Sequence, residues 1–390
     1  MKFRTFAWQS VPLVELCDIS IGRTPAREEK RYWGQGHRWL SIADMSQGKD
    51  LVTTRETITD EAVQKCRCKP VKPGTLLMSF KLSIGKLGFA RIPLFTNEAI
   101  AALPAKDSKR ILPEFLYYAL QVINPESGTD RAVMGRTLNT AKLEKLQIPL
   151  PPLAEQRRIA AILDKADAIR RKRKEAIRLA EEFLQSAFLD MFGDPVTNPK
   201  GWPVIKVIEA CDCIVPGRDK PKSFSGSTPW VTTDDLVPKG LTLGSKKGLG
   251  LSDAEIEEVR ARVIPKGSVI ITCVGELGLT SLAGIDFVIN QQLHAFQCTK
   301  KINNIYLMYA LSFQTPFMFR VATSTTVPYL NKTNCNSIPV PLPPLNEQVK
   351  FKSLVESTWK ACGTMNSSNA ESERLFHSLV QRAFRGELTA

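Results

Sequence analysis

Nine cysteines and three histidines are the residues of this sequence best suited to bind a metal ion or to act as nucleophiles. The closest cysteine pairs, Cys66/Cys68 and Cys211/Cys213, are separated by a single residue, whereas zinc sites commonly use pairs separated by about two to four residues. No histidine stands in a metal-type pair. We therefore expect the cysteines to serve as small buried hydrophobic residues in a reducing cytoplasm, and we expect no metal and no other cofactor.

The sequence gives equally little evidence for a segment that binds a phosphate group or a methyl donor. The stretch from Ser83 to Gly88, SIGKLG, has neither the spacing of a Walker loop nor a complete dinucleotide fingerprint. The Asn-Pro pairs at Asn124 and Asn198 lack the second proline and the tyrosine of a methyltransferase catalytic string, and turns explain both. The sequence thus predicts a chain without catalytic activity of its own.

Positive charge is the main functional signal of the composition. The formal net charge is +14, which is typical of a protein whose partner is a polyanion such as nucleic acid, and no apolar run is long enough to span a membrane. Arg, Lys, Asn and Thr side chains can contact base edges or phosphates, although each can also occupy a plain surface turn. The candidates at expected loops and strand ends are Arg23, Lys81, Lys86, Arg136, Asn139, Arg218, Lys220, Thr272, Asn290, Thr325 and Asn331.

A run of five basic residues, from Arg170 to Lys174, is a separate candidate. It could contact phosphates or an acidic patch on a partner protein, and the alternative is a solvated helix face. Five consecutive residues of a helix point in all directions, so the run cannot face one surface as a whole.

The elements that must position these residues occur twice, as an internal sequence repeat. Pro149-Leu150-Pro151-Pro152-Leu153, followed by one variable residue and Glu-Gln, recurs 192 residues later, from Pro341. Matching residues in the same order, at shifts of 190 to 195 residues, extend the repeat upstream. They pair Trp39 with Trp230, Gly74 with Gly267, Gly85 with Gly275, Gly88 with Gly278, and Asn139 with Asn331. The recurrence of Leu-Asn at Asn139 and Asn331 favours a turn there over the reading of bases.

Each copy begins with a segment that combines β-type and helical patterns. Short β-type runs such as GTLLMSF and GSVIITCVG are broken by glycine and proline, and one helical stretch follows in each copy, at 112–123 and at 304–313. This mixture predicts a compact α+β domain over about residues 1–150 and again over 195–342.

Each copy then ends in a long helix. Apolar residues recur every three or four positions from Ile159 to Ala187, and Gly193 with Pro195 provides a stop signal. So long an apolar stripe requires a partner helix, and the weaker stripe after Leu345 provides one, although residues 363–369 are poor in helix formers and predict a kink or fraying. We expect an antiparallel pair within the chain; pairing between two chains is the alternative.

The proline motif joins these two parts. Proline fixes its own backbone and keeps the preceding residue out of the helical conformation. The motif is therefore expected to be stiff and extended, to lie on a surface through its leucines, and to release the helix at a set angle.

Paired modules of this kind resemble the DNA-specificity subunit of type I restriction–modification enzymes. Other stretches agree with that family over essentially the whole chain, among them GRTP from Gly22, YWG from Tyr32, WLSI from Trp39, SIGK from Ser83 and AFRGEL from Ala383. The second copy departs from the first at 215–221 and at 290–292. Because recognition domains of this family vary with the bases that they read, no base-contact rule can be transferred.

The resemblance implies an α+β fold with a pseudo-twofold internal repeat. Two target-recognition domains, 1–150 and 195–342, would be joined by two antiparallel coiled-coil spacer helices, 151–194 and 343–390. Each domain would read one half of an asymmetric, split target in double-stranded DNA, and the partners would be two methyltransferase subunits and the restriction subunits, in the cytoplasm. The alternatives are a protein-interaction scaffold that does not read DNA and a fused DNA-modifying enzyme.

Overall fold

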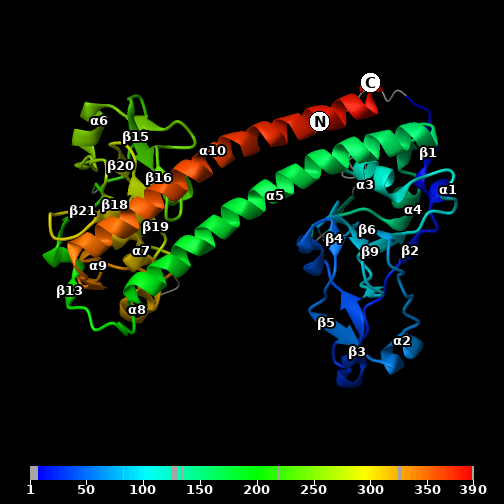
Figure 1. The fold of residues 1–390 in the computed structure, drawn as a ribbon, viewed down its shortest axis with the longest axis horizontal. Coiled ribbons are helices and arrows are strands. Elements are labelled where there is room, and N and C mark those ends of the chain that lie inside the picture. Colours follow the sequence, from blue (N-terminus) through cyan, green and yellow to red (C-terminus); the bar gives the residue numbers. More distant parts are fainter. Residues whose placement is uncertain are drawn as a thin grey trace. The chain divides into compact units, whose positions relative to one another are not determined.

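A computed structural model describes residues 8–81, 83–123, 130–132, 135–217, 219–323 and 327–388 (Figure 1). Lys81 and Lys86 are therefore among the described residues, whereas Arg218 and Thr325 lie outside them. The chain divides into two compact units. Unit 1 comprises Met1–Lys172 and Asn369–Ala390, and unit 2 comprises Arg173–Ser368.

Unit 1 contains a five-stranded sheet and a three-stranded sheet. The larger sheet has the order β2 (Ser20–Ile21), β9 (Ile100–Leu103), β6 (Leu76–Ser79), β7 (Leu87–Ala90) and β4 (Asp50–Leu51), and the smaller has the order β5 (Glu56–Ile58), β3 (Trp33–Leu40) and β8 (Phe95–Thr96). The strands β1 (Ser10–Pro12) and β12 (Gln147–Pro149) form a separate pair, as do β10 (Asp130–Ala132) and β11 (Gly135–Thr137). The short helices are α1 (Leu13–Leu16), α2 (Asp60–Lys65), α3 (Pro113–Val122) and α4 (Thr140–Glu144).

Unit 2 repeats the two sheets of unit 1 and its β1–β12 pair, strand by strand. Its larger sheet has the order β14 (Cys211–Ile214), β21 (Leu293–Cys298), β18 (Val269–Thr272), β19 (Thr280–Ala283) and β16 (Leu241–Thr242), and its smaller sheet has the order β17 (Gly250–Leu251), β15 (Thr228–Val231) and β20 (Val288–Ile289). The strand β13 (Val204–Lys206) pairs with β22 (Pro339–Pro341), and the helices are α6 (Asp253–Glu258), α7 (Asn304–Phe313), α8 (Thr315–Val321) and α9 (Lys332–Asn336). The internal repeat is confirmed.

The register of the repeat differs from the sequence expectation at one turn. The backbone N–H of Gly85 donates to the Ser79 carbonyl where β6 turns into β7, and the N–H of Gly278 donates to the Thr272 carbonyl at the corresponding turn. Both glycines have a positive φ, of 89° and 85°. Gly85 therefore corresponds to Gly278, and Gly88 corresponds to Ser281. The pairings of Gly85 with Gly275 and of Gly88 with Gly278 were wrong. A similar Gly-x-x-Gly spacing in both copies shifts the sequence alignment by three residues, because only the backbone conformation identifies the turn.

The two long helices are α5 (Leu153–Phe192) and α10 (Leu345–Phe384), each of 40 residues. The helix α10 is continuous through residues 363–369, where weak helix propensity predicted a kink. Intrinsic propensity is a weak term, and the buried residues Phe351 and Phe376 anchor the helix on either side of this stretch. In unit 1, Arg158 near the start of α5 binds the Leu388 carbonyl beyond α10, and Arg170 further along α5 contacts Glu373. The numbers rise along one helix as they fall along the other, so the pairing within the chain is antiparallel, as expected.

The core of each unit joins one sheet face to the long helices. In unit 1, Phe115 of α3 packs in one cluster with Ile159 and Leu163 of α5 and with Phe376 of α10. In unit 2 the corresponding cluster is aromatic and centres on Phe188 of α5. The ring of Phe188 lies 5.1 to 6.0 Å from five other rings, those of Phe192, Tyr306, Tyr309, Phe313 and Phe351. Within the described ranges, no helix is long and apolar enough to cross a membrane.

Candidate nucleic-acid interface

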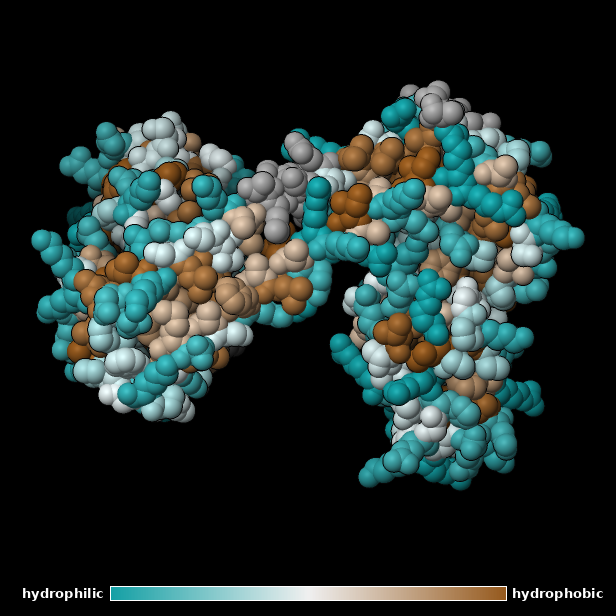
Figure 2. Space-filling view, in the orientation of Figure 1, coloured by the Kyte–Doolittle hydropathy of each residue, from teal (hydrophilic) through white to brown (hydrophobic). Residues whose placement is uncertain are grey.

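The three-stranded sheet of unit 1 carries a long strand, β3, that is largely exposed. In β3 the residues from Gly34 to Arg38 are all exposed, whereas Trp39 and Leu40 at its end are buried. Figure 2 shows predominantly hydrophilic side chains over the part of unit 1 that carries β3, β5 and α2. A polar exposed strand on a rigid sheet is a surface that could contact the edges of bases.

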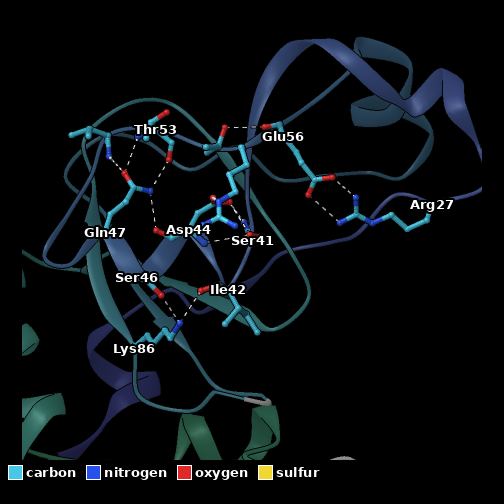
Figure 3. Close-up of polar contacts among 12 residues, drawn as sticks. Arg27, Ser41, Ile42, Asp44, Ser46, Gln47, Thr53, Glu56 and Lys86 are labelled. Atoms are coloured by element: carbon cyan, nitrogen blue, oxygen red, sulfur yellow. Dashed lines mark hydrogen bonds and ion pairs between the residues drawn. The ribbon is translucent and has the colours of Figure 1, made fainter. Parts of the chain in front are cut away.

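Arg27 packs against two tryptophans of β3, Trp33 and Trp39. The guanidinium of Arg27 lies 4.0 Å from the ring centroid of Trp33 and 5.0 Å from that of Trp39. It also pairs with the Glu56 carboxylate, with an Nη2–Oε2 distance of 3.1 Å (Figure 3). The hydrogen bond to Glu56 is the main cause of a raised pKa of Arg27, so the charge is permanent and its position is fixed.

Arg23, a candidate from the sequence, is exposed beside this cluster. Its Nη1 donates to the Cys66 carbonyl at 3.3 Å, and its own carbonyl accepts from the indole N–H of Trp39 at 3.1 Å. With Thr24, Cys66 and Glu98, it lines an open cavity of about 500 Å³. The structure therefore places Arg23 on a preformed surface concavity.

Lys86 stabilises the loop that follows β3. Its Nζ donates to the Ile42 carbonyl at 3.2 Å and to the Ser46 hydroxyl at 2.8 Å (Figure 3). The Gln47 side chain amide donates to the Asp44 and Thr53 carbonyls, each at 2.8 Å, which orders the rest of that loop. Lys81, five residues before Lys86, is half-buried with its Nζ 5.5 Å from the Phe80 ring centroid.

Asn139 and Asn331 are helix caps. The Asn139 side chain accepts from the Lys142 N–H at 2.9 Å at the start of α4, and Asn331 accepts from the Asn334 N–H at 2.8 Å at the start of α9. Their recurrence in both copies therefore reflects the turn that the sequence comparison favoured, because an Asn side chain at the N-cap satisfies a free backbone N–H.

Thr272 is not available for DNA contact. Its side chain is fully buried, and its hydroxyl accepts from the Leu279 N–H at 3.0 Å. Asn290 is half-buried and exchanges hydrogen bonds with Gln292, while Lys220 is exposed. Arg136 pairs with Arg131 in the β10–β11 hairpin, where the described structure covers the backbone alone.

Sequence reasoning missed Arg27 and the exposed face of β3. The signal was present in the string WGQGHRW, in which polar residues and glycines fill a strand between two tryptophans. It also missed Gln291, whose Nε2 donates to the Gly217 and Asp219 carbonyls at 3.2 and 3.0 Å and so holds the loop before Lys220.

The corresponding surface of unit 2 has different chemistry on the same scaffold. Where α2 of unit 1 is capped by Thr59, α6 of unit 2 is capped by Ser252. The Glu255 carboxylate of α6 accepts from the Ser223 hydroxyl at 2.5 Å and from the backbone N–H groups of Ser252 and Ser225. These hydrogen bonds, led by that of Ser223, lower the pKa of Glu255 to about 2. The Glu255 carboxylate therefore closes a capping box at the start of α6 and, at 8% exposure, supports the fold of this loop. The surface itself differs because β15, the counterpart of β3, has four residues, none of them exposed.

The basic run of α5 is partly committed to internal contacts. Arg170 pairs with the buried Asp167 at 2.6 Å and with Glu373 at 3.2 Å, and its guanidinium lies 4.6 Å from the Phe376 ring centroid. Arg171 pairs with Asp167 at 3.0 Å and with Asp50 of β4 at 3.5 Å. Arg170 thus links α5 to α10, and Arg171, whose side chain stays 45% exposed, links α5 to the sheet of unit 1. Both guanidinium groups are already paired with carboxylates.

The cysteines form no metal-binding cluster in the part of the chain that the structure describes. All nine are free thiols. Burial is the main reason that the pKa values of Cys17 and Cys273 are raised to about 12. Thiols of this kind are inert, because the thiolate is the reactive and metal-binding form.

Comparison with known proteins decides what this repeated architecture is. A family model for the type I restriction modification DNA specificity domain matches the chain twice, over residues 7–179 and 199–359. The chain belongs to this family. A relative that it resembles over nearly the full length is the MjaIX specificity subunit of Methanocaldococcus jannaschii, at 22% identity over 98% of this chain and 93% of that protein. The EcoR124I/EcoR124II specificity subunit of Escherichia coli is 26% identical over 43% of each chain.

Solved structures show the same fold. The S subunit of a type I restriction–modification system from M. genitalium superposes with a TM-score of 0.61 at 14% identity, covering 98% of both chains. Family membership gives the chain a specificity role, in which the catalytic steps belong to other subunits, in agreement with the expectation from its sequence.

Proposed function

We propose that this chain reads a bipartite, asymmetric DNA target and directs methyltransferase and restriction subunits to it. The observation that carries the proposal is that the two units share one fold but differ at the surface of their smaller sheets. In unit 1 the strand β3 exposes Gly34–Arg38, and Arg27 stacks on Trp33 at its start. The corresponding strand β15 of unit 2 has four residues, none of them exposed. Two different readers of one fold suit two different half-sites.

The domain boundaries of the proposal follow the sequence repeat. Residues 1–150 and 195–342 act as target-recognition domains, and residues 151–194 and 343–390 act as spacer helices. Rigid spacer helices hold two readers at a set separation, and readers on duplex DNA must both meet an accessible groove face, which recurs about every 34 Å. The number of unread base pairs between the half-sites is then part of the specificity.

The contacts to DNA are assigned within each unit. In unit 1 they come from Arg23, Lys81, the Arg27 cluster and the exposed face of β3, with Arg136 on its hairpin; in unit 2 they come from Lys220 and Asn290. Arg218 and Thr325 remain candidates from the sequence. Asn139, Asn331 and Lys86 support the fold around these contacts.

The partners proposed are two methyltransferase subunits and the restriction subunits. The relatives are named as specificity subunits of type I restriction enzymes. A solved structure that covers this chain completely, with a TM-score of 0.51 and 20% identity, concerns complex assembly of the type I restriction–modification system. The nine free thiols fit the reducing cytoplasm, where such a complex acts on DNA.

Mapping methylated adenines across a genome with and without this gene tests the proposal. The expected result is a split, asymmetric motif that appears only when the gene is present. A methylation pattern that does not depend on the gene contradicts the proposal. A scaffold that does not read DNA is distinguished by weak, salt-insensitive binding of the assembled complex to duplex DNA, since phosphate contacts impose a steep salt dependence.

A further inference from the structure

Two glutamines that follow the proline motif are buried in corresponding places. Gln156 lies in the first turn of α5 and Gln348 in the first turn of α10, and both side chains are 0% exposed. A buried amide is costly unless its oxygen and its nitrogen are both hydrogen-bonded. The partners of these amides therefore show what the two glutamines hold together.

In unit 1 the Gln156 amide joins three segments. Its Oε1 accepts from the Leu112 backbone N–H, at the N-cap of α3, at 2.9 Å. Its Nε2 donates to the Arg110 carbonyl, just before α3, and to the Pro151 carbonyl within the proline motif, each at 2.9 Å. One side chain thus connects the long helix, the proline motif and the globular domain.

Gln348 makes the same connection in unit 2. Its Oε1 accepts from the Asn303 N–H, at the N-cap of α7, at 2.8 Å, and its Nε2 donates to the Pro343 carbonyl at 2.7 Å. The two copies have diverged on their outer surfaces but keep this contact. A shared requirement of both copies, rather than the recognition of particular bases, therefore accounts for the two glutamines.

The proline motif explains why a side chain is needed at this place. Prolines have no backbone N–H, so the motif makes few backbone hydrogen bonds of its own. Leu150 and Leu342 donate to the carbonyls of Gln9 and Pro203, which ties the start of each motif to the β1–β12 and β13–β22 pairs. Beyond that point, the glutamine amide supplies the donor that fixes the last bend before the helix.

We propose that Gln156 and Gln348 are positioning residues that set the angle between each target-recognition domain and its spacer helix, and so set the gap between half-sites. This inference rests on the proposed bipartite function. A gap changed by one base pair moves a half-site by about 3.4 Å and rotates it by about 35° around the DNA axis. A rigid junction rejects that displacement, whereas a loosened junction tolerates it.

The test is Gln156→Glu in the complex assembled with methyltransferase subunits. A carboxylate of the same size still accepts from the Leu112 N–H, but it cannot donate to the Pro151 and Arg110 carbonyls. Methylation rates are compared on duplexes that carry the native gap and gaps one base pair longer or shorter. We expect the preference for the native gap to fall about tenfold, the effect of losing a buried hydrogen bond, while the bases preferred within each half-site stay the same.

The matched control is Glu155→Gln, one residue earlier in the same helical turn. The Glu155 carboxylate contacts Arg158 on the same helix, with an oxygen–nitrogen distance of 3.2 Å, and not the proline motif. The gap preference of this variant should equal that of the wild type. If Gln156→Glu and Gln348→Glu both keep the gap preference of the wild type, the inference is overturned. If the wild-type complex itself shows no gap preference, the bipartite function is overturned instead.

Hydrogen exchange in the wild-type complex provides a second measurement if a variant does not assemble. The Leu112 and Asn303 amides should exchange as slowly as the buried amides of α3 and α7, because each donates to a buried glutamine. Exchange at the rate of exposed loop amides would show that the junctions are not held in this way, and the inference would fail.

Discussion

At the scale of single residues, the structure separates side chains that build the fold from those that face the surface. Asn139, Lys86 and Thr272 share with Arg23 a chemistry that suits DNA contact. Their hydrogen bonds are satisfied within the protein, whereas Arg23 lines an open cavity. The type of a residue therefore defines what it can bind, and its burial defines whether it is free to do so.

The capping asparagines should affect stability and not base preference. Replacing Asn139 or Asn331 by alanine removes an N-cap hydrogen bond, which typically costs about 1 kcal/mol. Denaturant unfolding of each variant should show that loss, and the methylated motif should keep the same bases. A changed base preference in either variant would mean that the asparagine reads DNA after all.

A buried histidine should make unit 2 sensitive to acid. His294 is 3% exposed, with its Nε2 2.7 Å from the Cys213 sulfur, and burial, aided by Lys332, lowers its pKa to about 4. An unfolded histidine binds a proton near pH 6.5, so stability is fully present above that value and falls by about 3 kcal/mol as the pH drops to 4. Unfolding measured over this range should show a shallower fall for His294→Gln than for the wild type.

The control for that comparison is His377→Gln at an exposed position of α10. This variant retains His294 and should retain the acid sensitivity of the wild type. An identical pH dependence in His294→Gln and the wild type would show that protonation of His294 does not contribute.

At the scale of elements, each long helix depends on the core that it enters. The helix α5 contributes Ile159 and Leu163 to the core of unit 1 and Leu184, Phe188 and Phe192 to the core of unit 2. The apolar stripe seen in the sequence predicted that α5 needs a partner. It did not show which core each end of α5 enters, because periodicity records only that a residue is apolar.

Phe188 and Phe183 provide a matched pair on this helix. Phe188 is fully buried within the aromatic cluster, whereas Phe183 is 52% exposed. Phe188→Ala should lower the free energy of unfolding by about 3 to 5 kcal/mol, because it leaves a cavity and removes ring contacts. Phe183→Ala should change it by less than about 0.5 kcal/mol; a comparable loss in both variants, measured by denaturant unfolding, would contradict the assigned packing.

At the scale of the whole molecule, the repeat predicts that specificity is modular. Arg38→Ala on the exposed face of β3 should alter base preference in one half of the target, and Lys220→Ala should affect only the other half. Loss of a good base contact weakens discrimination by about 1 to 3 kcal/mol. Methylation of target libraries randomised in each half measures this; an effect of either substitution on both halves would argue against independent readers.

Local sequence alone determined the repeat, the proline junction, the two long helices and the family, because order, period and proline chemistry are properties of the chain. Tertiary structure decided which polar groups are buried or hydrogen-bonded within the protein. It corrected the partner of Gly85, buried Thr272 and placed Arg27 between Trp33, Trp39 and Glu56. It also brought Leu112 to Gln156, 44 residues away. Such contacts join residues distant in sequence, and only folding determines which donors meet which acceptors.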